Sequence, residues 1–139
     1  PGSLADYTVL EIEHILPNNP DSTLHSAFET ANPGKPYDDQ KIRLGNLTLL
    51  EKPINIVAGR DFFTDKKTEY RKCKHYLTSS IAEIVTVGKN SSINRMNQKL
   101  EAFDNWTAAT IEKRQDLLGN LARELWKTSQ ISIDEEAPA

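Results

Sequence analysis

Cysteine is almost absent from this chain of 139 residues, and its scarcity excludes two kinds of cross-link. The single cysteine, Cys73, cannot form a disulfide within the chain. Without a CxxC pair or a cluster of Cys and His, the sequence also predicts no structural zinc site. Both absences are typical of a protein that works in a reducing environment, so we expect a cytoplasmic location.

Long apolar runs are missing as well, and so is any overall positive charge. No segment approaches the roughly 20 apolar residues that a membrane-spanning helix needs. No secretory signal is recognisable at the N-terminus, so we expect no membrane partner. The formal net charge of −3 gives no global sign of a polyanionic ligand.

The length and an apolar share of 37% suit one globular domain, which we expect over residues 7–128. Pro1-Gly2-Ser3 is typical of a cut expression tag, so we assign residues 1–6 to a tag remnant or linker. The segment 129–139 ends in Asp-Glu-Glu-Ala-Pro-Ala, and this acidic tail is predicted to be disordered.

Positive charge is concentrated in one stretch of the chain. Between Lys41 and Tyr76 there are nine Lys or Arg and four acidic residues, an excess of five positive charges, whereas the remainder has an excess of eight negative charges. Such a run is most often a solvated helix face, but this one coincides with the motifs described below. The candidate phosphate contacts within it are Arg43, Lys52, Lys66 and Lys67.

Two strands and a helical segment are predicted in the first half of the chain. Apolar and polar residues alternate from Tyr7 to Leu16, which is typical of a strand, and Pro17 stops it. A second strand follows a turn within residues 44–50. The apolar spacing becomes helical over residues 53–70, with a break at Gly59.

The long segment between the two strands is expected to hold one short helix. Asp21 or Ser22 can cap a helix that extends to about Thr30, and Asn32-Pro33-Gly34 ends it. A polar loop is expected from there to Gln40.

The second half of the chain is predicted to be a helical scaffold. Ser92 can cap one helix, which is expected to carry Met96, Leu100 and Phe103. A longer helix over residues 107–128 carries an apolar stripe of Ile111, Leu118, Leu121 and Leu125. Trp106 and Trp126, at its two ends, are expected to be packing anchors. Arg114 lies beside the stripe, where packing on apolar neighbours or pairing with an acid is favoured over a phosphate contact.

Four polar residues at three places carry the candidate chemistry. Glu13-His14 ends the first strand, Asn46 precedes the second, and Asn55 follows nine positions later. Each has an ordinary explanation by itself, since a strand-end histidine is seldom catalytic and asparagine is a common turn residue. Their combination offers a base and oxygen ligands for a cation, which are the groups that phosphodiester hydrolysis needs.

Hydrolysis of a phosphodiester needs a base to activate water and a cation to neutralise charge. His14 is the candidate base, because the unperturbed pKa of histidine lies near neutral pH. Glu13 and Asn55 offer oxygen ligands that suit Mg²⁺, for which Mn²⁺ can substitute. Neighbours on an ideal strand point to opposite faces, so Glu13 and His14 can share a site only where the strand twists or ends.

These motifs resemble two related groups of nucleases. Glu13-His14, Asn46 and Asn55 are similar to the motif of the HNH (ββα-metal) nucleases. The segments EHILP, RLGNLTLLEKPIN and FFTDKK, with a late W…I…R…L…W pattern, resemble the C-terminal domain of GmrSD-type modification-dependent restriction enzymes and related phage-defence proteins. The resemblance covers residues 7–128. It implies an α+β fold, with a ββα core of a two-stranded hairpin plus a helix embedded in a mainly helical domain.

The resemblance also implies roles and partners. Asn46 would brace the loop between the strands so that His14 is correctly aimed, while Glu13 and Asn55 would bind the metal. The chain would be a Mg²⁺-dependent DNA endonuclease or nickase, the effector of a restriction or phage-defence protein. A separate N-terminal nucleotide-hydrolysing sensor domain would belong to the full-length protein. This chain has no P-loop, so we expect no nucleotide in it.

Two alternatives stay open on the sequence. The chain could be a catalytically inactive DNA-binding or protein-interaction module with the same fold, although the intact set of site residues argues against such decay. It could also cleave RNA, because the motif addresses phosphates and not the 2′-hydroxyl group.

Overall fold

An antiparallel hairpin with a long insertion between its strands organises the first half of the chain. The structure is a computed structural model that describes residues 10–58, 62–86, 88–89 and 92–136. Strand β1 (Leu10–His14) pairs with β2 (Leu47–Glu51), in a register that places His14 opposite Leu47 and Leu10 opposite Glu51. Both predicted strands are confirmed, and the predicted start at Tyr7 lies outside the described residues.

The insertion contains two helices and a short 3-10 turn. Helix α2 (Ser22–Ala31) begins as predicted, because Asp21 Oδ1 accepts a hydrogen bond from the Leu24 amide at 2.8 Å. The expected polar loop to Gln40 is wrong in part, since it contains helix α3 (Tyr37–Lys41). This helix is stabilised by a tertiary contact, because Tyr37 is fully buried and its hydroxyl donates to the Pro17 carbonyl at 2.7 Å. The turn η1 (Leu44–Asn46) then leads into β2.

Helix α4 (Lys52–Ala58) follows β2 directly and packs against both strands. The order strand, strand, helix is compatible with the predicted ββα core. Helix α5 (Phe63–Tyr70) packs against α4, and the predicted break at Gly59 lies outside the described residues. Helix α6 (Tyr76–Ala82), which the sequence reading did not assign, packs against α5 and β2. The α+β class is confirmed.

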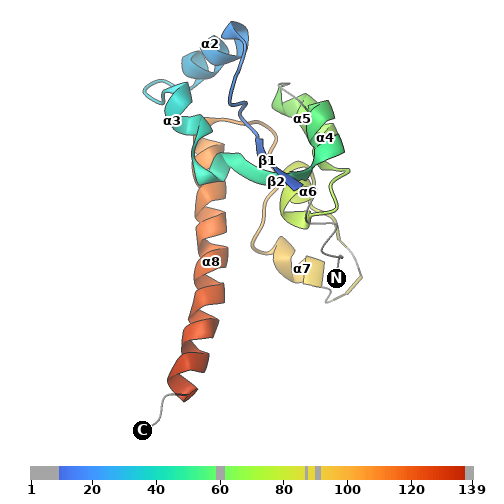
Figure 1. Ribbon diagram of the computed structural model, residues 1–139, viewed down its shortest axis with the longest axis vertical. Helices are drawn as coiled ribbons and strands as arrows, with labels where there is room; N and C mark the ends of the chain where they lie inside the picture. Colours follow the sequence, from blue (N-terminus) through green and yellow to red (C-terminus); the bar gives the residue numbers. More distant parts are fainter. Residues whose placement is uncertain (1–9, 59–61, 87, 90–91, 137–139) are drawn as a thin grey trace.

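The C-terminal scaffold differs from its predicted form at both helices. Helix α7 (Ser92–Asn97) is short, and α8 (Ala108–Glu136) continues into the segment predicted to be disordered. No proline or glycine interrupts residues 120–136, so nothing in the local sequence stops the helix there. In Figure 1, α8 passes the hairpin at its first turns and then projects away from the rest of the molecule.

That projection overturns two expectations. Leu125 is 69% exposed and Trp126 is 67% exposed, so the apolar stripe ends before Leu125 and Trp126 is not a packing anchor. Trp106 is buried as predicted, between Phe63 and Phe103, with ring centroids at 5.1 and 5.4 Å.

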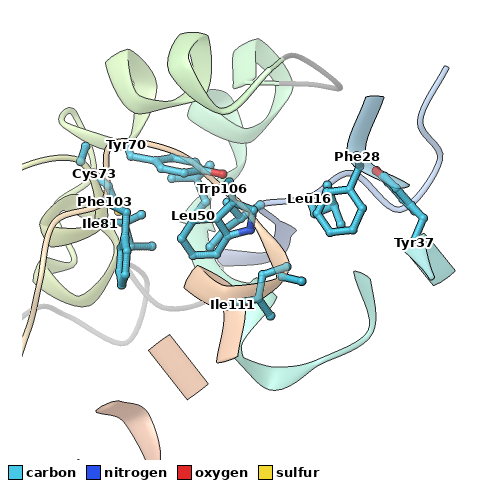
Figure 2. Close-up of a cluster of buried hydrophobic side chains, with 13 residues drawn as sticks. Leu16, Phe28, Tyr37, Leu50, Tyr70, Cys73, Ile81, Phe103, Trp106 and Ile111 are labelled. Carbon is cyan, nitrogen blue, oxygen red and sulfur yellow. The ribbon is translucent and has the colours of Figure 1, made fainter. Parts of the chain in front are cut away.

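The core gathers side chains from β2, from five of the helices (α2, α3, α5, α6 and α8) and from the segments between them. Figure 2 shows Trp106 and Leu50 between two groups of apolar side chains, one with Phe103 and Ile81 and the other with Leu16. The hairpin is therefore fixed from several sides. Within the described residues, no helix has the length and apolar character that crossing a membrane requires.

Candidate active site

The end of β1 is held by a single buried asparagine. Asn46 Oδ1 accepts from the Leu16 amide at 2.7 Å and from Trp106 Nε1 at 2.8 Å. Its Nδ2 donates to the Leu16 carbonyl at 3.0 Å and to the Lys41 carbonyl at 2.8 Å. The side chain thereby uses both acceptor positions and both donors, and its own carbonyl accepts from the Ile15 amide at 3.0 Å. These contacts fix the backbone directly after His14.

Helix α8 fixes the turn that carries this asparagine. Arg114 Nη1 donates to the carbonyls of Gly45 at 2.9 Å and Leu47 at 2.6 Å. Arg114 thus bonds to backbone carbonyls, in place of the acid or phosphate considered from the sequence. Burial lowers the pKa of Arg114 to about 10, so the guanidinium stays charged at neutral pH. A Cβ on Gly45 would lie 2.0 Å from the Ile111 carbonyl oxygen, so only glycine permits this approach.

Three of the predicted site residues line one pocket. The pocket has a volume of about 280 Å³ and lies where β1 ends. Its lining combines Glu13, His14 and Asn55 with four residues that were not predicted to belong to the site: Ile12, Pro17, Asn18 and Asn19. Asn46 is not in the lining, because it is buried behind the strand end.

The environment of His14 favours its neutral form. Burial lowers the pKa of His14, the nearby Glu13 opposes that shift, and the charges of Lys66 and Lys41 add to it. A lowered pKa leaves more of the imidazole unprotonated near neutral pH, which is the form that can accept a proton.

Glu13 is anchored in a buried network beside this histidine. Lys66 Nζ lies 2.6 Å from Glu13 Oε1 and donates to the His14 carbonyl at 2.8 Å. The Tyr70 hydroxyl donates to the same Oε1 at 2.8 Å, and burial raises the pKa of Tyr70 far enough to keep it a phenol. Neither bond uses Glu13 Oε2. The carboxylate is thus held by one oxygen at the edge of the pocket.

Asn55 is oriented by a carboxylate that the sequence reading missed. Its Nδ2 donates to Glu11 Oε2 at 2.8 Å, which directs the other branch of the amide, Oδ1, away from Glu11. Glu11 and Glu13 lie two positions apart on β1, so the alternation of the strand already placed them on one face. That spacing was the available signal.

The candidate phosphate contacts occupy very different places. Lys66 is buried in the network around Glu13, and this placement removes its ammonium from the surface, so the expectation of a phosphate contact there is corrected. Lys67 lies over the Phe63 ring and 3.9 Å from Asp104. Lys52 is exposed, 3.9 Å from Glu11, and Arg43 Nε donates to Gln115 at 3.4 Å.

The donor set fits a hard divalent cation. Among the described residues no group of three or more His, Cys, Asp or Glu could hold a metal ion. Mg²⁺, however, keeps several water ligands and needs only one or two protein oxygens. Glu13 and Asn55 both line the pocket, and each side chain carries oxygen of that kind.

The family of GmrSD restriction endonuclease C-terminal domains matches residues 2–121 of the chain. No curated protein and no solved structure matches it.

Proposed function

Because this chain belongs to the family of GmrSD restriction endonuclease C-terminal domains, we propose that it is an HNH-type, Mg²⁺-dependent endonuclease that cuts or nicks DNA. It acts as the effector domain of a restriction protein, with a separate nucleotide-hydrolysing sensor domain as its partner. One observation carries the proposal: Glu13, His14 and Asn55, from two separate elements, line the same pocket.

His14 is the general base in this proposal. Its imidazole accepts a proton from a water molecule, whose oxygen then attacks the phosphorus atom. The bond from phosphorus to the 3′ oxygen breaks, so that the products carry 5′-phosphate and 3′-hydroxyl ends. The lowered pKa of His14 supports this role, because a base must be unprotonated when it acts.

The acidic and amide oxygens serve the cation. Glu13 through Oε2 and Asn55 through Oδ1 would hold Mg²⁺, or Mn²⁺ in its place. When bound, the ion would neutralise charge on the phosphate and on the departing oxygen. Asn46 is a positioning residue, which keeps the backbone after His14 in place through its four side-chain hydrogen bonds.

The test is an assay of supercoiled plasmid with the purified chain and Mg²⁺ or Mn²⁺. We expect nicking that EDTA abolishes, and a rate about 10²- to 10⁴-fold lower for His14→Ala. His25→Ala is the matched control, since His25 stacks on Tyr37 in the insertion and does not line the pocket. A parallel assay with single-stranded RNA separates the nuclease classes. Binding of DNA without any cleavage would instead support a non-catalytic module.

A further inference from the structure

A lysine outside the candidate contacts lies at the rim of the His14 pocket. Lys41 is the last residue of α3, and its Nζ donates to the Asn18 carbonyl at 3.2 Å. Asn18 lines the pocket together with His14. The ammonium group of Lys41 is therefore hydrogen-bonded to a residue of the pocket lining.

The main chain of Lys41 is tied to the active site by the brace. Asn46 Nδ2 donates both to the Lys41 carbonyl and to the carbonyl of Leu16, two residues after His14. One amide group thus connects the end of α3 to the end of β1. The backbone of Lys41 is therefore held in a fixed position relative to His14, which would not be the case for a lysine on an unattached loop.

Two lysines bond to backbone carbonyls at the end of β1 and directly after it, Lys66 to that of His14 and Lys41 to that of Asn18. Their side chains differ in exposure. The Lys66 side chain is fully buried, with its ammonium on Glu13 and the His14 carbonyl. The Lys41 side chain retains 21% of its exposure.

The partner of Lys41 is easily displaced. Lys41 Nζ pairs with Asp38 Oδ1 at 2.6 Å, but the Asp38 side chain is 74% exposed. Lys41 lowers the pKa of the Asp38 carboxyl, through a hydrogen bond and through charge. An exposed pair of this kind is screened by water and salt, so a phosphate can replace the carboxylate without leaving a buried charge unpaired.

We propose that Lys41 binds a backbone phosphate of the nucleic acid at the Asn18 rim of the pocket, with Asp38 holding its ammonium in place until the phosphate replaces it. The inference rests on the proposed function and adds a substrate contact to it. Lys41 is the first residue of the basic stretch, and it lies on the insertion rather than on α4 or α5.

The test measures binding separately from cleavage. Every variant is made in the His14→Ala background, and the affinity for a labelled DNA duplex is measured by fluorescence anisotropy across a salt series. Lys35→Met is the matched control for Lys41→Met, because Lys35 is an exposed lysine near α3 that does not line the pocket. Asp39→Asn is the control for Asp38→Asn, as its exposed neighbour on α3.

We expect Lys41→Met to weaken binding about tenfold more than Lys35→Met, and to reduce the slope of log Kd against log salt by about one. Lys41→Arg should keep most of the affinity, and Asp38→Asn should tighten binding more than Asp39→Asn. Only the loss of a competing carboxylate explains that last increase; a purely structural role for the pair predicts a decrease.

Equal affinities and slopes for Lys41→Met and Lys35→Met would overturn the proposal, as would tighter binding by Asp39→Asn than by Asp38→Asn. If the wild-type chain cuts plasmid but Lys41→Met and Lys35→Met bind DNA equally, the role of Lys41 is wrong and the proposed function stands. If no variant binds DNA and the wild-type chain does not cut it, the proposed function fails with it.

Discussion

Asn46 and Asn55 are nine positions apart and are chemically identical, yet their surroundings differ completely. Asn46 is fully buried and its side chain makes four hydrogen bonds. Asn55 is half-buried, lines the His14 pocket and is oriented by Glu11. The first arrangement suits a structural brace and the second suits a metal ligand.

Alanine variants of the two asparagines should therefore fail in different ways. Asn55→Ala should raise the Mn²⁺ concentration needed for half-maximal nicking, with recovery at excess metal and little change in stability. Asn46→Ala should lose about 3 kcal/mol of stability, because buried partners are left unpaired, and extra metal should not restore its rate. Metal titrations of the nicking rate beside urea melts give both readouts. Metal rescue of Asn46→Ala with none of Asn55→Ala would mean that the roles are reversed.

Lys66 and Lys67 are likewise identical residues in different surroundings, although they are adjacent in the chain. Both lie on α5 within the basic stretch, and one is buried on Glu13 while the other crosses the Phe63 ring. Helical geometry turns adjacent side chains by about 100°, so one of two neighbours commonly faces inward. A lysine that faces inward needs a carboxylate there, and Glu13 supplies it.

At the scale of elements, the contact between α8 and η1 determines the position of the site. Gly45 lies against the Ile111 carbonyl, while Arg114 and Gln115 of α8 bond to the turn. Since η1 carries Asn46, an element far along the chain fixes the brace on which the strand end depends.

Gly45→Ala should therefore push α8 away from η1. Its Cβ would meet a backbone oxygen at 2.0 Å, and we expect a loss of about 1–3 kcal/mol of stability together with lower activity. Gly119→Ala is the control on α8 itself, where the nearest atom is a flexible Arg123 nitrogen at 3.7 Å. That variant should gain about 0.5–1 kcal/mol from helix propensity. Urea melts of both proteins test the contrast, and equal stabilities would contradict it.

At the scale of the whole molecule, the two tryptophans report on different parts of it. Trp106 is buried in the core, whereas Trp126, on α8, is 67% exposed. Figure 1 shows α8 projecting from the body of the molecule after its first turns. The first half of α8 is thus a packed element, and Trp126 contributes little to folding.

Trp126→Phe should leave the free energy of unfolding within about 0.5 kcal/mol of the wild-type value, because the side chain is exposed. It should also remove most of the fluorescence that acrylamide can quench in the folded protein, since Trp106 is buried. Chemical denaturation followed by fluorescence and by circular dichroism provides both measurements. Protection of Trp126 from acrylamide in the wild-type protein would show instead that another surface covers this part of α8.

The local elements of the site could be predicted from the sequence because their signals are local. The alternation around Glu11 and Glu13, the cap at Asp21, and the turn before β2 each depend on residues that are close in the chain. Helix α3 was missed for the opposite reason. Its burial depends on Tyr37 reaching the Pro17 carbonyl, a contact across 20 positions.

The sequence by itself determined the family, the α+β class and the residue types at the candidate site, because motif and periodicity are properties of neighbouring positions. Only the tertiary structure decided which lysine is buried, which carboxylate orients Asn55, and how far α8 remains packed. Those outcomes depend on contacts between side chains that are far apart in the chain. Burial and charge pairing result from such contacts, so they cannot be inferred from any one segment.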